Sequence, residues 1–163
     1  KQVVLLDAFA VTSGYVIRAA AGAVAIDVTP SPWLYVTTGA GALFIVLGRR
    51  FAEARLAGDS VGEQRTVLKD YSGPFIGQLL TLSAAAAWLS YTLYTVEATN
   101  LPDNNTMLFT LPLVTFGLFR YLYLLNNSEQ AEAPEQLIVR DLPLVLSIVS
   151  WVAVSTLVLL LDN

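Results

Sequence analysis

The chain of 163 residues contains neither cysteine nor histidine. Disulfide frameworks, thiolate nucleophiles, Cys/His zinc sites and histidine acid–base chemistry are therefore excluded. Any chemistry must use carboxylates, Arg and Lys, hydroxyl groups, or a metal bound through oxygen ligands.

Charge is also scarce. Only 13% of the residues are charged and 55% are hydrophobic, with a mean hydropathy of +0.61. So few charged residues cannot cover the surface of a soluble domain of this size. The composition therefore predicts an integral membrane protein.

Several apolar stretches are long enough, or nearly so, to cross a hydrocarbon core of roughly 30 Å, which requires about 20 helical residues. We expect five transmembrane helices, at residues 4–26, 33–48, 74–96, 107–125 and 142–161. The second is short, but its helical pattern continues through Arg49 and Arg50. Ser31-Pro32, Gly73-Pro74 and Asp141-Leu142-Pro143 are typical of helix starts. The expected fold class is an all-α polytopic membrane protein.

Basic residues lie mainly on one side of these helices. The two longer connections, 49–73 and 126–141, share that side, and the loops on the opposite side contain no Lys or Arg. The basic residues on the side of the long loops are Lys1, Arg49, Arg50, Arg55, Arg65, Lys69 and Arg140. By the positive-inside rule, we expect a multi-pass protein of the cell membrane with both long loops in the cytoplasm. Since the chain begins with Lys1 and shows no signal-peptide pattern, we also expect Lys1 to be an internal position of a longer protein.

The first expected helix contains Asp7 and Arg18 within apolar sequence. Eleven residues at about 100° each place them within roughly 20° of one another, and Gly14 and Gly22 lie near the same stripe. A charge that faces lipid near the bilayer centre costs at least about 2.5 kcal/mol, so this stripe is expected to face the protein interior. Arg18 then either contacts an anionic ligand in a cavity open to the cytoplasm, or pairs with a neighbouring helix.

The segment from Gly48 to Pro74 concentrates charge. Glu53 and Asp59 are candidate oxygen ligands for Mg²⁺. Guanidinium and ammonium groups suit phosphate binding. The four basic candidates for phosphate contacts are Arg49, Arg50, Arg65 and Lys69. The alternative is a topology signal with exposed salt bridges, which contribute little to stability.

A further cation, Arg120, precedes Tyr121 near the cytoplasmic end of the fourth expected helix. Its long side chain either reaches the lipid headgroups or faces a cavity shared with other helices. The sequence leaves both interpretations open.

The order and spacing of these elements resemble the C-terminal half of the UbiA-superfamily prenyltransferases, over essentially the whole chain. Within that superfamily the chain is most similar to the branch that transfers phosphoribosyl groups. The matching segments are Leu6-Asp7, Gly14–Arg18, Ala20–Gly22, Ser31–Trp33, Gly48–Arg50, Ala52-Glu53, Arg65, Leu68, Tyr71-Ser72, Arg120–Tyr123, Pro134-Glu135 and Arg140–Pro143.

This resemblance implies a nine-helix fold, of which the chain supplies the last five helices, around a cavity that opens to the cytoplasm. It implies that polyprenyl (decaprenyl) phosphate attacks the anomeric carbon of phosphoribosyl pyrophosphate, with Mg²⁺ neutralising the departing diphosphate. The product would enter cell-wall arabinan synthesis. The substrate-binding candidates are Arg18, Arg49, Arg50, Arg65, Lys69 and Arg120, and Glu53 is the metal candidate. The lipid bilayer is the other expected partner, and no nucleic acid is expected.

Two departures from the superfamily pattern qualify this expectation. Arg49-Arg50 and Glu53 stand where ordinary members have a second aspartate-rich motif, which favours phosphoribosyl transfer over prenyl transfer to an aromatic acceptor. The family commonly has Lys in place of Arg49. The first motif, an Asn/Asp-rich Mg²⁺–diphosphate ligand, belongs to the missing N-terminal half, so this chain alone is expected to be inactive. The alternatives are a UbiA-type aromatic prenyltransferase and a non-catalytic membrane module.

Overall fold

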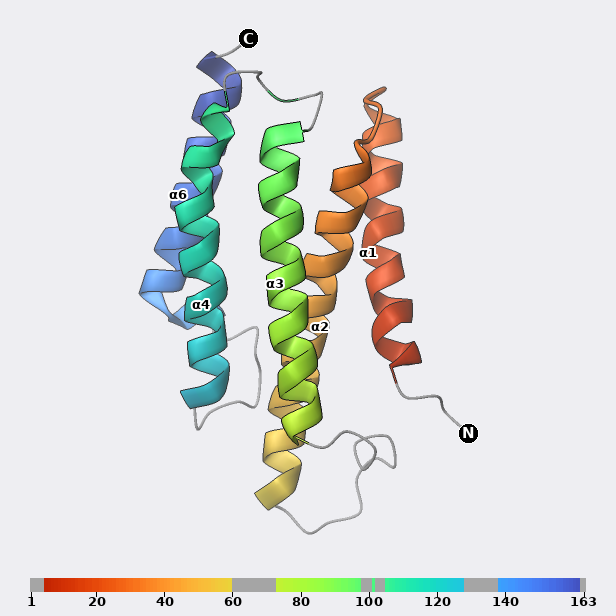
Figure 1. Cartoon of the computed structure of the whole chain (residues 1–163), viewed down its shortest axis with the longest axis vertical. Coiled ribbons are helices and arrows are strands. Elements are labelled where there is room, and N and C mark those ends of the chain that lie inside the picture. The colour runs from red at the N-terminus through yellow and green to blue at the C-terminus, as the bar shows by residue number, and fades with distance from the viewer. Residues whose placement is uncertain (1–4, 60–72, 98–100, 102–104, 128–137, 162–163) are drawn as a thin grey trace.

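The computed structural model describes residues 5–59, 73–97, 101, 105–127 and 138–161, and these residues contain no β-strand. The elements in chain order are α1 (Leu6–Ala25), α2 (Pro32–Asp59), α3 (Gly73–Glu97), the 3₁₀-helix η2 (Thr106–Thr110), α4 (Leu111–Asn127) and α6 (Leu142–Leu161). The long helices run alternately up and down, with α1 at one edge of the array and the α4–α6 pair at the other (Figure 1). The expected all-α architecture is confirmed.

Four segments among the described residues are long and apolar enough to cross a membrane: Leu6–Ala25, Pro74–Glu97, Thr106–Asn127 and Leu142–Leu161. The sequence predicted five, and the missing one is α2. This helix has 28 residues, about 42 Å of helix, so it is long enough. Threonine and glycine in its first half and the Arg49-Arg50 pair lower its average hydropathy. The structure does confirm that α2 continues through both arginines.

The helix starts predicted at Ser31-Pro32, Gly73-Pro74 and Asp141-Leu142-Pro143 are confirmed. Ser31 directly precedes α2, and its Oγ accepts a hydrogen bond from the backbone N–H of Trp33 at 3.2 Å. At the start of α6, the N–H of Leu144 donates to Asp141 Oδ1 at 2.9 Å. Both side chains satisfy a backbone donor that has no partner within its own helix.

The beginning of the fourth predicted helix differs from expectation. Residues 106–110 form a 3₁₀-helix, and the α-helix starts at Leu111, whose N–H donates to the carbonyl of Leu108. The physical reason is Pro112, which has no N–H to donate to the carbonyl four residues earlier and whose ring crowds that carbonyl.

The core lies where α2, α3, α4 and α6 meet. Phe44 of α2 packs edge-on against Tyr121 of α4, with ring centroids 5.3 Å apart, and Leu80 of α3 and Leu144 of α6 are buried in the same cluster. Gly48 permits this close approach of α2 and α4. A Cβ atom at Gly48 would stand 2.8 Å from Tyr121 Oη.

We therefore expect Gly48→Ala to lower the free energy of unfolding by about 1–3 kcal/mol, because overpacking forces rings and backbone apart. The measurement is thermal unfolding in detergent micelles. Gly41→Ala is the matched control on the same helix, since a Cβ there meets nothing within 4 Å and alanine favours helix. Equal stability of the two variants would show that the α2–α4 contact is looser than described.

Hydrogen bonds from the three tryptophan indoles join neighbouring helices. Trp33 Nε1 donates to Glu97 Oε2 at 2.9 Å, which joins α2 to α3. Trp88 Nε1 donates to Thr115 Oγ1 and Trp151 Nε1 to Tyr91 Oη, each at 2.8 Å, which join α3 to α4 and to α6. In a membrane such bonds supply the attraction that burial of apolar surface supplies in water.

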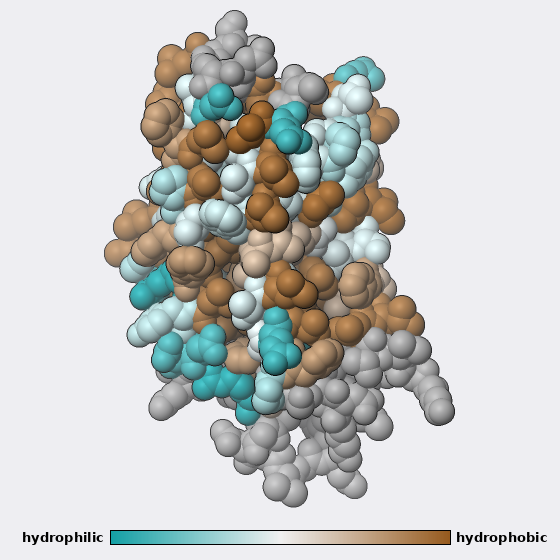
Figure 2. All heavy atoms as spheres, in the orientation of Figure 1, coloured by the Kyte–Doolittle hydropathy of each residue, from teal (hydrophilic) through white to brown (hydrophobic). Residues whose placement is uncertain are grey.

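The surface agrees with a membrane environment. In Figure 2, hydrophobic residues cover much of the middle of the molecule, and hydrophilic residues gather mainly toward its lower end. Large apolar side chains are exposed on several helices, including Ile17 of α1, Leu82 of α3, Phe119 of α4 and Leu160 of α6. The protein is therefore an all-α polytopic membrane protein.

Candidate functional site

A charged cluster joins α1 to α2 at the end of the bundle where α1 begins. Arg50 Nη2 lies 2.7 Å from Asp7 Oδ2, and Arg50 Nη1 lies 2.8 Å from Glu53 Oε2. All three side chains are partly exposed, between 25% and 35%. One guanidinium thus holds two carboxylates from different helices, a geometry that its planar fork of donors suits well.

Two residues predicted for the site, Arg50 and Glu53, are brought together in this cluster. Arg50 contacts both carboxylates, and its predicted contact with phosphate stays a prediction. Asp7, which the sequence grouped with Arg18, instead joins the cluster through Arg50. The sequence could not indicate this contact, because the helical spacing within α1 says nothing about which residue of α2 lies opposite.

The described residues do not by themselves form a magnesium site. They contain no group of three or more Asp or Glu side chains that could hold a metal ion. Glu53 can offer one carboxylate, and Mg²⁺ in phosphate-transfer sites typically takes one or two carboxylates plus phosphate oxygens and water. Further ligands would have to come from substrate and from residues beyond those described.

Arg18 lies apart from this cluster, on an exposed side of α1. Its guanidinium carbon is 5.5 Å from the ring centroid of Tyr15, a cation–π contact. Among the described residues no carboxylate pairs with it. A Cβ atom at Gly14 or Gly22 would meet nothing within 4 Å. The stripe that was expected to face the protein interior is thus uncovered by the residues that the structure describes.

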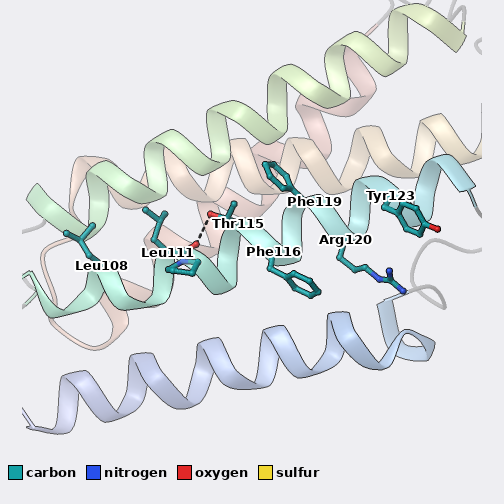
Figure 3. A pocket seen from close by; sticks show the side chains of 8 residues that line it. Leu108, Leu111, Thr115, Phe116, Phe119, Arg120 and Tyr123 are labelled. Atoms are coloured by element: carbon teal, nitrogen blue, oxygen red, sulfur yellow. Dashed lines mark hydrogen bonds between the residues drawn. The ribbon is translucent and has the colours of Figure 1, made fainter.

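Arg120 has a role that neither sequence interpretation anticipated. It forms a bidentate pair with Asp141, with Nε 3.1 Å from Oδ1 and Nη2 2.8 Å from Oδ2. Its guanidinium carbon lies 5.2 Å from the ring centroid of Tyr123, and its side chain points from α4 toward the start of α6 (Figure 3). The pair fastens these two helices together.

The Arg120 side chain also affects the protonation of Asp141. Its hydrogen bonds are the main reason that the pKa of Asp141 lies below the ordinary value. Partial desolvation raises this pKa, and the hydrogen bond from the Leu144 N–H lowers it. Asp141 therefore stays ionised and serves both as helix cap and as counter-ion.

Arg55 joins α2 to α4, a contact that the sequence analysis did not predict. Its Nη1 donates to the carbonyls of Leu125 and Asn126, at 2.6 and 2.8 Å. These are carbonyls of the last turn of α4, where a cation also interacts favourably with the helix dipole. A separation of about 70 residues leaves no sequence signal for such a contact.

Arg49 is exposed on α2 beside the cluster. Arg65 and Lys69 lie outside the described residues, as does the side chain of Asp59, so their phosphate and metal roles stay predictions.

Two apolar cavities of about 560 Å³ each accompany these charges, a volume within the usual range for ligand sites. The first runs along the face of α4 shown in Figure 3, from Leu108 past Phe116 and Phe119 to Arg120. The second lies between α2, α3, α4 and α6. Its lining is almost wholly apolar and includes Phe44, Ala87, Gly117 and Trp151.

The described chain is thus an all-helical membrane protein with a charged cluster at one end and two apolar cavities. No family model matches the chain. The chain is homologous to the C-terminal half of proteins named decaprenyl-phosphate phosphoribosyltransferase.

Three such relatives illustrate the similarity. The protein from Mycobacterium tuberculosis is 31% identical over 153 residues, covering 94% of this chain and 50% of the relative. That from Mycolicibacterium smegmatis is 29% identical over 160 residues, covering 93% and 50%, and that from Corynebacterium glutamicum 26% over 154 residues, covering 93% and 46%. The chain thus spans about half the length of these relatives, and the resemblance inferred from the sequence is confirmed.

Proposed function

We propose that this chain forms part of a UbiA-type transferase that moves the phosphoribosyl group of phosphoribosyl pyrophosphate onto polyprenyl (decaprenyl) phosphate in the cell membrane. The similarity along 94% of the chain to proteins named for this reaction carries the proposal. The charged cluster at one end of the bundle and the apolar cavities support it, since a lipid phosphate needs both environments.

In the proposed reaction, a phosphate oxygen of the polyprenyl phosphate forms a bond to C1 of the ribose, and the bond from C1 to diphosphate breaks. Arg49, Arg65 and Lys69 contact the donor's phosphate groups, which stabilises the departing diphosphate. Arg50, held by Asp7, keeps the Glu53 carboxylate oriented toward the site. Mg²⁺, when bound, would neutralise charge on the diphosphate. Acceleration then depends on positioning and electrostatics, without a covalent nucleophile.

The isoprenoid chain of the acceptor requires an apolar environment. The cavity between α2, α3, α4 and α6 offers one, because its lining is almost entirely carbon. Since the bilayer is itself apolar, moving the isoprenoid chain from lipid into this cavity gains little hydrophobic free energy, and the lining serves by offering the chain a packed apolar path.

We further propose that the charged cluster and both long connections are cytoplasmic. The Lys/Arg asymmetry of the sequence supports this orientation. In the folded chain, the end of α2 and the beginning of α3 lie at the same end of the array as the end of α4 and the beginning of α6 (Figure 1).

The test is an assay of this chain after co-expression with the N-terminal half of a mycobacterial relative. Labelled phosphoribosyl pyrophosphate, polyprenyl phosphate and Mg²⁺ should yield a labelled lipid, and omission of Mg²⁺ with added chelator should abolish it. Prenyl diphosphate with aromatic acceptors should yield no product. Prenylation of an aromatic acceptor would replace this proposal with the aromatic reaction, and inactivity with every substrate in a demonstrably assembled pair would favour a non-catalytic module.

A further inference from the structure

The exposed surface of α1 divides into two stripes of different character. Phe9, Ser13 and Ile17 follow one another at four-residue spacing, and Phe9 and Ile17 are 52% and 66% exposed. Gly14, Arg18 and Gly22 follow one another at the same spacing, five residues further along the helix and therefore roughly 140° away. The first stripe suits contact with lipid, whereas the second combines small residues with a charge.

The stripe of Gly14, Arg18 and Gly22 is uncovered by the rest of the described chain. Ideal Cβ atoms at both glycines face open space, and Arg18 contacts the ring of Tyr15, itself an exposed side chain. α1 lies at the edge of the helix array and packs mainly against α2 (Figure 1). Arg18 stands thirteenth of the 20 residues of α1, well inside the membrane-spanning segment.

A guanidinium at that depth is unfavourable in lipid, so such groups almost always face the protein interior or a water-filled cavity, where an oppositely charged side chain or backbone carbonyls pair with them. Glycines spaced along one helix face let a second helix approach closely. The chain spans about half the length of its relatives. A helix from the remaining half of such a protein can therefore cover this surface.

We infer that the Gly14–Arg18–Gly22 stripe is the docking surface for a transmembrane helix of the N-terminal half, and that a carboxylate on that helix pairs with Arg18. The glycines set the distance between the two helices, and the ion pair sets their depth relative to one another. This inference rests on the proposed half-site, but it concerns assembly and not transfer.

The experiment measures assembly without substrates. The affinity-tagged chain is co-expressed with the N-terminal half of the Mycolicibacterium smegmatis relative, and the amount of that half recovered in mild detergent is determined. Arg18→Gln and Gly14→Leu should each reduce recovery about tenfold, comparable to loss of one charge-assisted bond. Arg18→Lys, which keeps the charge, should retain most of it.

Matched controls come from the other stripe. Ser13→Leu and Ile17→Ala make changes of similar size on the side assigned to lipid and should leave recovery unchanged, with all variants present at equal levels in the membrane. If Arg18→Gln and Gly14→Leu both recover the N-terminal half at the wild-type level, the inference is wrong.

A second readout distinguishes the two possible partners of Arg18, a transmembrane helix and a phosphate ligand. If Arg18→Gln assembles normally but the assembled pair loses affinity for inorganic pyrophosphate, Arg18 faces a phosphate ligand and the inference is wrong. Failure of the wild-type chain to recover the half, while that half recovers its own native counterpart, would also overturn it. Charge-dependent assembly of a pair that transfers nothing would count against the proposed reaction alone.

Discussion

The 163-residue chain purified by itself is expected to show no transfer of phosphoribosyl groups above background. The described residues contain no cluster of carboxylates able to hold Mg²⁺, and Glu53 is held by Arg50. Mg²⁺ typically takes one or two protein carboxylates with phosphate oxygens and water, and in the proposed half-site the carboxylates additional to Glu53 come from the N-terminal half. Assembly with the N-terminal half of a relative should raise activity from background to a readily measured rate.

The assay follows the appearance of label in the lipid fraction, for the chain alone, for the partner half alone and for the two together. Glu53→Gln in the assembled pair is the internal control, since it keeps the volume and removes the charge. Turnover by the isolated chain at a rate similar to the pair would refute the half-site argument.

Single-cysteine labelling should give an all-or-none result for orientation. The chain has no cysteine, so one introduced thiol reports on one position. Thr29 and Asn127 are both exposed and lie at opposite ends of the bundle. In intact cells a membrane-impermeant maleimide should label Thr29→Cys strongly and Asn127→Cys hardly at all, and permeabilisation should expose Asn127→Cys.

The physical reason is the cost of moving Lys and Arg across the membrane, which retains basic loops on the cytoplasmic side. Thr29 lies in a loop without Lys or Arg, whereas Asn127 begins the connection that ends with Arg140. Labelling of Asn127→Cys from outside, with protection of Thr29→Cys, would reverse the proposed topology and place the charged cluster outside the cell.

Much of the fold follows from local features of the sequence. Long apolar runs determine where the helices lie, and capping residues such as Ser31 and Asp141 determine where α2 and α6 begin. The 3₁₀ turn was not predicted, although Pro112 offered a signal for it. The apolar run alone did not reveal that α2 is less hydrophobic than the other long helices.

The candidate site was predicted less completely, because its contacts join different helices. Composition and spacing identified Arg50, Glu53 and Arg120 as unusual charges. They could not identify Asp7 and Asp141 as the carboxylates that engage them, since contacts between helices depend on packing. For Arg18, the sequence predicted a stripe that faces the protein interior, and the described residues leave this stripe uncovered.

The three indole hydrogen bonds and the ion pairs of the bundle should respond differently to ionic strength. Each of them involves α3, which they join to α2, α4 and α6, and α3 carries no charged residue before Glu97. The described ion pairs and the Arg55 contacts join α1 to α2, α2 to α4 and α4 to α6, and they bypass α3. Salt weakens contacts between partly exposed charges but barely affects bonds within an apolar layer. Ionic strength should therefore weaken the ion pairs and the bond of Trp33 to the exposed Glu97 carboxylate, while the neutral bonds of Trp88 and Trp151 continue to hold α3 to α4 and α6.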